Sequence, residues 1–342
     1  MEADTLALVW FGLLGALLMG YAILDGFDLG VGIMHLFIAR DDRDRRLTLN
    51  SIGPLWDGNE VWLVTFGGAM FAAFPEAYAT IFSGFYSAFM LLLFALIFRA
   101  VSIEFRSKRA NPFWRGAWDV GFALSSFAAT LLFGVAVGNV IRGVPITAAG
   151  EYDGTLIAQL NPYALLVGAL TVTLFAMHGT IFLYLKTEGE LQLRAQRWMW
   201  RNFGLFLVVF MLATMYTLVA VPEAVAHFER LPLLWIIPVL NVLAIANIPR
   251  AIFNGNPGHA FISSVCSIVA LVFLLGAALY PYLVPSSPNP EHGLTIYNAA
   301  SSPRTHGIML LIALIGIPAV LAYTGLVYWT FRGKVTLDEH SY

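Results

Sequence analysis

Four acidic residues lie in or beside long apolar stretches of the sequence, where an ionised side chain is costly. Asp25 and Asp28 lie within the first such stretch, and Asp57 and Glu60 open the second. Placing a charge at the centre of a membrane helix costs about 2.5–3.5 kcal/mol on insertion scales. The members of each pair are three residues apart, so they share one face of a helix. These four carboxyl groups are therefore the first candidates for chemistry.

The placement of the four acids favours proton transfer. If the two stretches form antiparallel helices, all four carboxyl groups lie in the same half of the membrane, with Asp25 about 13 Å from the end of its helix. Carboxylates that lie close together in a low-dielectric site cannot all stay ionised, so they can take up and release protons. We predict a proton pathway through Asp25, Asp28, Asp57 and Glu60. Two other interpretations stay open: Asp57 and Glu60 could only stabilise a helix start, and Asp25 and Asp28 could pair with arginines.

Two further side chains are candidates for contact with a ligand. Arg99 ends the third apolar stretch, and it could extend to the membrane surface or bind a cofactor propionate, a quinone head group or a carboxylate. Of the seven histidines, we expect only His178 at membrane depth. A haem with two histidine ligands needs another at the same depth, so we expect a hydrogen-bonded helix contact, with haem ligation as the alternative. There is no C-x-x-C-H site for a covalently attached haem, and we predict no metal site in this chain.

The elements that position these residues are predicted to be membrane-spanning helices. Of the 342 residues, 59% are hydrophobic and 12% are charged, whereas soluble domains carry about 25% charged residues. This composition also gives no basic footprint for nucleic acid, and the single cysteine excludes a multi-cysteine iron–sulfur site. A spanning helix needs about 20 mostly apolar residues. Nine stretches qualify, at 5–33, 55–75, 77–99, 117–141, 162–185, 202–221, 231–250, 260–283 and 305–331. We therefore predict an all-α, polytopic integral membrane protein with nine transmembrane helices.

The basic residues give the predicted helices a direction. With nine helices, sixteen of the nineteen Lys and Arg residues fall on one side of the membrane and three on the other. Cytoplasmic loops carry the excess of Lys and Arg. Removing one helix would put later basic loops on the wrong side. We therefore predict that the N-terminus is outside and the C-terminus is cytoplasmic, with the four acids toward the cytoplasmic face.

Three segments, read together, resemble one protein family. They are LDGFDLGVG at 24–32, WDGNEVW at 56–62 and FRAVSIEFRSK at 98–108. These segments are similar to motifs of subunit II of cytochrome bd quinol oxidase, and weaker similarity covers essentially the whole chain. The acids of DGFD and WDGN fall on three of the four residues named above. Glu60 lies at a position where relatives would accept Gln or Thr.

The resemblance implies a fold, a partner and a function. It implies two four-helix bundles plus a peripheral helix in a single membrane domain, divided at 1–141 and 142–342. Subunit II would pair with a haem-bearing subunit I, which holds haems b and d, oxidises quinol and reduces oxygen to water in the aerobic respiratory chain of the bacterial inner membrane. Subunit II would stabilise that partner and contribute cytoplasmic-side carboxylates to proton uptake, and it is not expected to be active alone. A quinone or lipid bound near Trp56 and Arg99, surrounding membrane lipids and small single-helix subunits complete the implied complex.

Two rival functions stay open at this point. In a secondary transporter the four acids would bind a coupling ion, but such sites use corresponding helices of two repeated halves. Here all four acids lie in one half of the chain. A self-contained cytochrome would need a second axial ligand to match His178. Ion-coupled uptake by the isolated chain would favour the transporter, and a haem spectrum of the isolated chain would favour the cytochrome.

Overall fold

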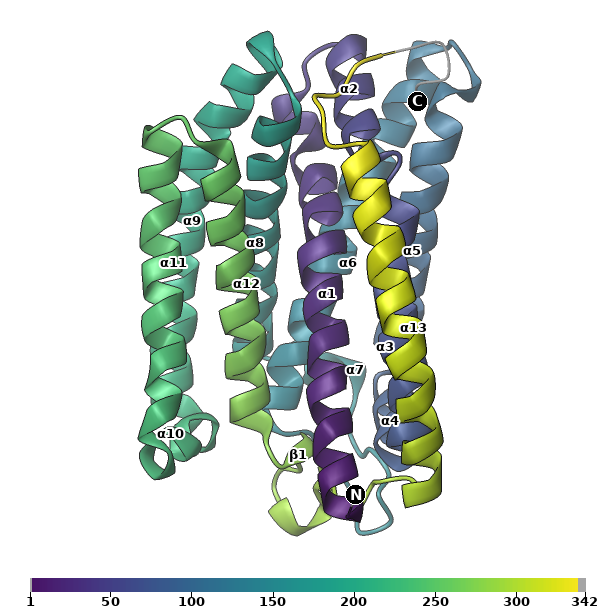
Figure 1. Ribbon diagram of the computed structural model, residues 1–342, viewed down its shortest axis with the longest axis vertical. Helices are drawn as coiled ribbons and strands as arrows, with labels where there is room; N and C mark the ends of the chain where they lie inside the picture. The colour runs from purple at the N-terminus through teal and green to yellow at the C-terminus, as the bar shows by residue number, and fades with distance from the viewer. Residues whose placement is uncertain (1, 338–342) are drawn as a thin grey trace.

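The computed structural model describes residues 2–337 and is built almost wholly of long helices (Figure 1). In chain order the helices are α1 (Ala3–Ile38), α2 (Asp42–Ile52), α3 (Trp56–Ala73), α4 (Pro75–Gly84), α5 (Tyr86–Phe105), α6 (Pro112–Arg142), α7 (Leu156–Gln159), α8 (Pro162–Lys186), α9 (Gly189–Ala220), α10 (Ala226–Arg230), α11 (Ile236–Phe253), α12 (Pro257–Leu279) and α13 (Pro303–Thr330). Short 3-10 helices are η1 (Arg106–Lys108), η2 (Pro222–Val225), η3 (Pro232–Trp235) and η4 (Pro290–His292). Strands β1 (Tyr282–Val284) and β2 (Leu294–Thr295) pair antiparallel between α12 and α13.

Several long helices begin at a proline that directly follows a capping side chain. Asn111 before α6, Asn161 before α8 and Ser302 before α13 each accept a hydrogen bond from a backbone N–H in the first turn. The cap satisfies a donor that the helix start leaves unpaired, and the fixed φ of proline suits the first helical position. Local sequence therefore sets where these helices begin.

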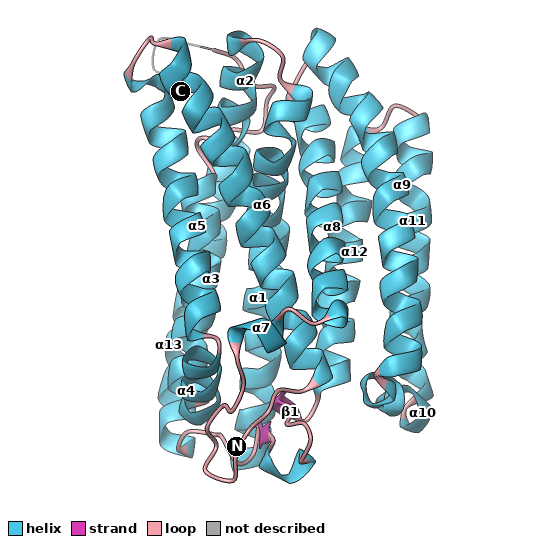
Figure 2. Ribbon diagram, turned by 180° about the vertical axis from the view of Figure 1, so that it is seen from behind, coloured by secondary structure: helices cyan, strands magenta, loops and turns pink. Residues whose placement is uncertain are grey.

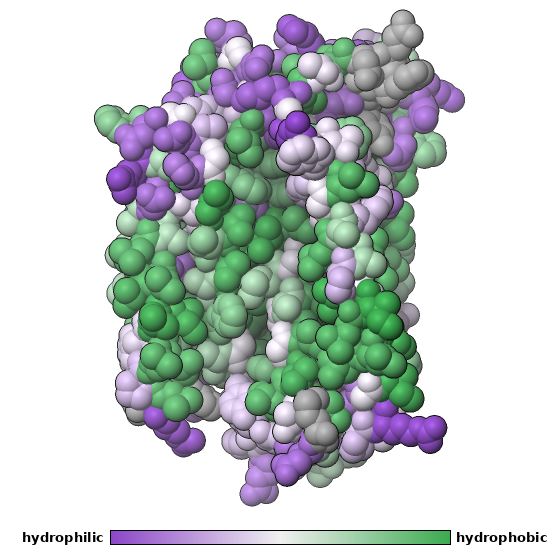
Figure 3. All heavy atoms as spheres, in the orientation of Figure 1, coloured by the Kyte–Doolittle hydropathy of each residue, from purple (hydrophilic) through white to green (hydrophobic). Residues whose placement is uncertain are grey.

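The all-α, multi-pass fold is confirmed. Among residues 2–337, eight helices are long and apolar enough to cross a membrane: α1, α5 with η1, α6, α8, α9, η3 with α11, α12 and α13. Figure 3 shows an apolar band between two polar ends on the face it displays. The remaining predicted span, α3, has only 18 residues and carries Asp57, Asn59 and Glu60 near its start. By the same criteria of length and hydropathy, α3 is too polar to count as a membrane span. The predicted number of nine spans is therefore not confirmed.

The helices run further than the apolar stretches that predicted them. α1 continues to Ile38, and α5 continues to Phe105, so Arg99 lies inside a helix and not at its end. The stretch at 77–99 forms two helices, α4 and α5, which meet at Phe85. Helix α2 was not predicted, because its sequence is polar. Helix bounds follow backbone hydrogen bonds and caps, which hydropathy does not report.

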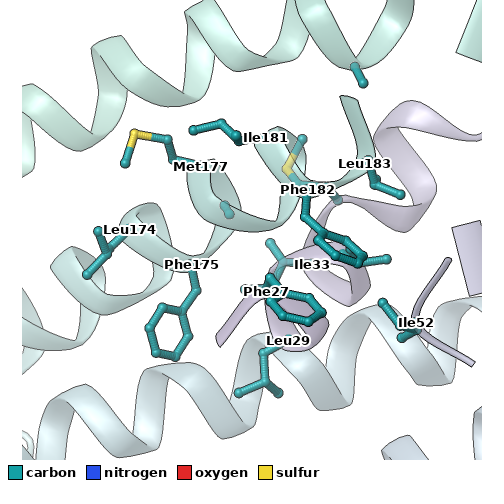
Figure 4. Close-up of a cluster of buried hydrophobic side chains, with 14 of the residues drawn as sticks. Phe27, Leu29, Ile33, Ile52, Leu174, Phe175, Met177, Ile181, Phe182 and Leu183 are labelled. Carbon is teal, nitrogen blue, oxygen red and sulfur yellow. The ribbon is translucent and has the colours of Figure 1, made fainter. Parts of the chain in front are cut away.

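Helix α1 lies at the centre of the molecule and contacts α3, α6, α8 and α12 (Figures 1 and 2). It approaches α8 closely where Gly30 meets Gly179. A Cβ atom added at Gly30 would lie 1.8 Å from the carbonyl oxygen of Phe175, so only glycine fits there. Figure 4 shows the apolar side chains around this contact, among them Phe27 and Phe182, whose rings stack 4.0 Å apart. This packing fixes the position of the polar residues that α1 carries.

Helices from both halves of the sequence share one core. Figure 1 shows α8, α9, α11 and α12 on one side and α3, α5 and α13 on the other, with α1 and α6 between them. The predicted division at 141/142 falls between α6 and α8, yet α8 packs against both α6 and α9. The division into two bundles therefore stays a prediction, and the C-terminal end of the second unit lies outside the described residues.

Candidate functional site

Arg99 binds two of the predicted acids. Its Nη1 donates to Oδ1 of Asp25 at 2.6 Å, and its Nη2 donates to Oε2 of Glu60 at 3.1 Å. The side chains of Arg99 and Asp25 are buried, whereas that of Glu60 is 24% exposed. One arginine of α5 therefore joins an acid of α1 to an acid of α3.

Asp28 is held by neutral groups. The side-chain amide of Asn59 donates to Oδ2 of Asp28 at 2.7 Å, and the hydroxyl of Tyr328 donates to Oδ1 of Asn59 at 2.9 Å. These bonds link α1, α3 and α13. Tyr21 is buried one turn before Asp25 on the same face of α1. We name these residues the mid-membrane cluster, which consists of Tyr21, Asp25, Asp28, Asn59, Glu60, Arg99 and Tyr328.

The mid-membrane cluster has more carboxyl groups than cations. Arg99 is the cation that Asp25 and Glu60 share, and Asp28 has none within hydrogen-bond distance among the described residues. Buried atoms without a hydrogen-bond partner there include the Tyr21 hydroxyl, Oδ2 of Asp25 and Oδ1 of Asp28. Because an uncompensated buried charge is very costly, three carboxylates cannot all be ionised beside one guanidinium. The cluster can therefore hold a proton on a carboxyl oxygen.

Asp25 lies further from the end of its helix than we predicted. Asp25 lies thirteen residues before the end of α1 at Ile38, which is about 20 Å along a helix that rises 1.5 Å per residue. The predicted distance of about 13 Å was wrong, because α1 continues past the last residues of its apolar stretch.

Two other predicted residues lie outside these hydrogen bonds. Asp57 is exposed in the first turn of α3 and makes no hydrogen bond or ion pair with the described residues. Trp56 is buried in the main hydrophobic core. The structure therefore brings Asp25, Asp28 and Glu60 together with Arg99 and leaves Asp57 at the surface.

A second polar cluster, which we did not predict, surrounds Asp119 near the end of α1. The Asp119 carboxylate interacts with Nε2 of His35 at 2.8 Å, Nη1 of Arg45 at 2.8 Å and Nε of Arg106 at 2.6 Å. Asp42 accepts hydrogen bonds from Arg106 and Arg115, each at 2.9 Å. Nδ1 of His35 lies 2.7 Å from Oγ1 of Thr48. We name this the end cluster, which consists of His35, Asp42, Arg45, Thr48, Arg106, Arg115 and Asp119.

One residue of the end cluster, Asp119, could have been predicted from the sequence. Asp119 lies inside the predicted span at 117–141, so the rule that singled out Asp25 would also have found it. Its partners had no such signal, because His35 is 84 positions away and Arg45 is 74 positions away.

One helix face connects the two clusters. Successive polar or small residues on α1 lie three or four positions apart and so share a face: Tyr21, Asp25, Asp28, Gly32 and His35. Ser126 of α6 lies against the middle of this face, since a Cβ atom added at Gly32 would lie 2.0 Å from its Oγ. The Oγ of Ser126 is buried and has no hydrogen-bond partner among the described residues.

Comparison with known proteins decides the family. A sequence model of the family described as cytochrome bd terminal oxidase subunit II matches residues 6–331. The chain belongs to this family. It is 36% identical over 369 residues to cytochrome bd-I ubiquinol oxidase subunit 2 of Escherichia coli (strain K12), covering 99% of this chain and 97% of that protein. It is 33% identical over 334 residues to cytochrome bd ubiquinol oxidase subunit 2 of Bacillus subtilis (strain 168), covering 97% of each.

A solved structure supports the same fold. The chain superimposes on a chain from the structure of bd oxidase from Geobacillus thermodenitrificans with a TM-score of 0.78 and 19% sequence identity, covering 96% of this chain and 98% of the other. The resemblance predicted from the DGFD and WDGNE segments is confirmed. As a bd oxidase subunit II, the chain is part of a respiratory oxidase family and not of a transporter family.

His178 does not offer a free haem ligand in this subunit II. Its Nδ1 lies 2.7 Å from Oγ of Ser264, and its Nε2 lies 3.0 Å from the carbonyl oxygen of Ile23. The ring also stacks on Phe261. Within the described part of the chain, no group of three or more His, Cys, Asp or Glu residues could hold a metal ion. Both ring nitrogens of His178 are therefore already engaged, and we assign no step of the reaction to a haem in this chain.

Proposed function

We propose that this chain is the haem-poor subunit of a bd-type quinol:oxygen oxidoreductase in the inner membrane of a bacterium. A haem-bearing subunit I would hold haems b and d, oxidise quinol and reduce oxygen to water. This chain would stabilise that subunit and supply protons to it. The family match over residues 6–331 and the names of the relatives support the first part of the proposal.

The observation that carries the proton role is the shortage of cations in the mid-membrane cluster. Arg99 contacts two of three buried or half-buried carboxyl groups. With one compensating charge, the neighbouring carboxyl groups have to share protons. A proton held on one of them can pass to the next without creating an extra buried charge.

Particular oxygens are suited to carry that proton. Oδ1 of Asp25 accepts from Arg99 and Oδ2 of Asp28 accepts from Asn59. The other oxygen of each carboxyl group, Oδ2 of Asp25 and Oδ1 of Asp28, is buried without a partner. A proton on either of these oxygens would leave the bonds to Arg99 and Asn59 intact.

Uptake would begin at the first turn of α3. Asp57 is exposed there, and Glu60 follows three residues later, on the same helical face and half-buried against Arg99. We propose the order Asp57, Glu60, then Asp25 and Asp28. The uneven distribution of Lys and Arg supports the assignment of this end to the cytoplasm, with the N-terminus outside.

We assign no contact with a quinone or a lipid to Trp56 or Arg99. Trp56 belongs to the hydrophobic core, and two nitrogens of Arg99 are bound to Asp25 and Glu60. Arg99 instead positions these two acids.

The test uses the assembled complex of both large subunits. Asp28→Asn keeps the shape of the side chain but cannot carry a proton in the same way, so we expect turnover to fall roughly tenfold or more. Haem content, read from the visible spectrum, should stay normal. Oxygen consumption with excess quinol, measured across pH, is the readout. Asp57→Asn tests the proposed point of uptake in the same assay.

Asp44→Asn is the matched control. Asp44 is a buried acid that forms an ion pair with Arg194 outside the mid-membrane cluster, so its loss should not change turnover per haem. The proton role is wrong if Asp25→Asn, Asp28→Asn and Glu60→Gln complexes all turn over like the wild type at every pH. Asp57 is not the point of uptake if Asp57→Asn alone behaves in that way.

A further inference from the structure

A cavity of about 230 Å³ lies beside the end cluster, between the start of α2 and the segment that joins α5 to α6. Four arginines and two aspartates provide its charged lining. The residues that line it are Arg40, Asp41, Asp42, Arg45, Ala110, Arg106, Pro112 and Arg115. The lining therefore has an excess of two positive charges, and it lies beside the ends of α5 and α6, which are long and apolar enough to cross a membrane.

The arginines of this cavity have hydrogen-bond donors to spare. Arg106 is buried, and its Nε and Nη2 are bound to Asp119 and Asp42. Its Nη1 is buried without a partner among the described residues, and so is Nε of Arg45. The guanidinium group of Arg40 forms no hydrogen bond or ion pair with residues 2–337. An unpaired buried donor on a charged group is costly, so an acceptor bound in the cavity would stabilise these arginines.

We propose that this cavity binds a phosphate group. Guanidinium groups bind phosphate oxygens through short, charge-assisted hydrogen bonds, and several of them around one cavity suit an anion that accepts bonds from several directions. A carboxylate offers only two oxygens in one plane, whereas a phosphate offers oxygens in a tetrahedron. The site is separate from the mid-membrane cluster and does not depend on the proposed proton role.

Asp42 acts as an internal competitor for the phosphate. It accepts hydrogen bonds from Arg106 and Arg115, and its side chain is 46% exposed. A phosphate in the cavity lies beside this carboxylate and shares its cations. Removing the charge of Asp42 should therefore strengthen phosphate binding, and removing the charge of Arg40 should weaken it.

The surroundings suit a phospholipid headgroup, although inorganic phosphate offers the same chemistry. Phe113 follows Pro112 of the cavity wall and is 86% exposed, and Phe105 is also exposed beside η1. Exposed aromatic side chains next to a cluster of arginines are typical of the level of lipid headgroups. The two sources of phosphate are distinguished by the experiment.

The experiment compares four forms of the complete two-subunit complex: wild type, Arg40→Gln, Asp42→Asn and the control Arg197→Gln. Arg197 is an exposed arginine of α9 outside the cavity and forms no ion pair with the described residues. Each complex is placed in nanodiscs of phosphatidylcholine with a minor fraction of phosphatidylglycerol. Native mass spectrometry then measures the phosphatidylglycerol that stays bound. Calorimetric titration of the detergent-solubilised complex with inorganic phosphate is the second arm.

We expect Arg40→Gln to lower the binding of phosphatidylglycerol or phosphate roughly tenfold, because it removes one charge-assisted hydrogen bond. Asp42→Asn should increase binding, and Arg197→Gln should leave it unchanged. An effect confined to phosphatidylglycerol identifies a lipid headgroup, and an effect on inorganic phosphate as well identifies a general phosphate site. The proposal is overturned if Arg40→Gln and Arg197→Gln behave alike in both arms. If Arg40→Gln does not assemble, unchanged binding in Asp42→Asn overturns it equally.

Discussion

The mid-membrane cluster and the end cluster use the same kinds of side chain in different proportions. In the end cluster, Asp119 and Asp42 are surrounded by three arginines, and each carboxylate contacts at least two cations. In the mid-membrane cluster, Arg99 forms ion pairs with two carboxylates, and Asp28 accepts a hydrogen bond, among the described residues, only from the side-chain amide of Asn59. Each cluster has a partly exposed member, Arg45 at 30% and Glu60 at 24%, and its central residues are buried.

We propose that this difference separates a structural role from a functional one. A network in which each carboxylate contacts at least two cations ties helices together and has no need of an exchangeable proton. Buried acids with too few nearby cations have to be partly protonated, because an uncompensated carboxylate is too costly to bury. We therefore expect variants of the end cluster to change stability at constant turnover, and carboxylate variants of the mid-membrane cluster to change turnover at nearly constant stability.

Arg99→Gln should have the largest effect of all. It leaves Asp25 and Glu60 without a cation in a buried site, and removing one partner of a buried ion pair costs about 3–5 kcal/mol. We expect little assembled complex, measured as the yield of haem-containing oxidase after purification. The double variant Arg99→Gln with Asp25→Asn should recover part of the yield, since it removes one of the two carboxylates left without a cation. Normal assembly of the single variant would mean that Arg99 does not balance these acids.

Asp119→Asn should destabilise the complex without slowing it. The carboxylate contacts of Arg45, Arg106 and His35 are weakened together, and each hydrogen bond to a charged group contributes about 1.5–3 kcal/mol. We expect a lower midpoint of thermal unfolding and an unchanged turnover per haem. If turnover falls while the unfolding midpoint stays constant, protons pass through the end cluster, and the contrast between the two clusters disappears.

Glu60→Gln should lower turnover less than Asp28→Asn does. Glu60 is 24% exposed, so water can take over part of its role, whereas Asp28 is buried with one oxygen unpartnered. The two variants are compared by oxygen consumption per haem at the same pH. An equal or larger loss for Glu60→Gln would move the essential proton carrier from α1 to α3.

The spans and the buried acids were predictable because both depend on local sequence. Apolar stretches of helical length reveal a membrane helix, and an acid inside one is conspicuous. Hydropathy gave too short a distance from Asp25 to the end of its helix, since α1 extends beyond its apolar residues to Ile38. It also ended the third span at Arg99, because an arginine lowers hydropathy without ending a helix.

The partners of these acids were not predictable, because they come from distant parts of the chain. Tyr328 is 269 positions from Asn59, and Arg99 is 74 positions from Asp25. Nothing in the apolar sequence around Tyr328 marks it as part of a polar cluster. Such contacts depend on how the helices pack, which close glycine contacts such as Gly30 with Gly179 decide.

Tyr328→Phe should give the smallest effect and tests whether α13 belongs to the mid-membrane cluster. The hydroxyl of Tyr328 donates to Asn59, and a single hydrogen bond of this kind contributes about 1 kcal/mol to stability. We expect a small decrease in the thermal unfolding midpoint and a modest change in turnover, because Asn59 also holds Asp28. Tyr323→Phe is the matched control, since Tyr323 is an exposed tyrosine of the same helix. Identical behaviour of the two variants would restrict the cluster to α1, α3 and α5, and α13 would then contribute packing alone.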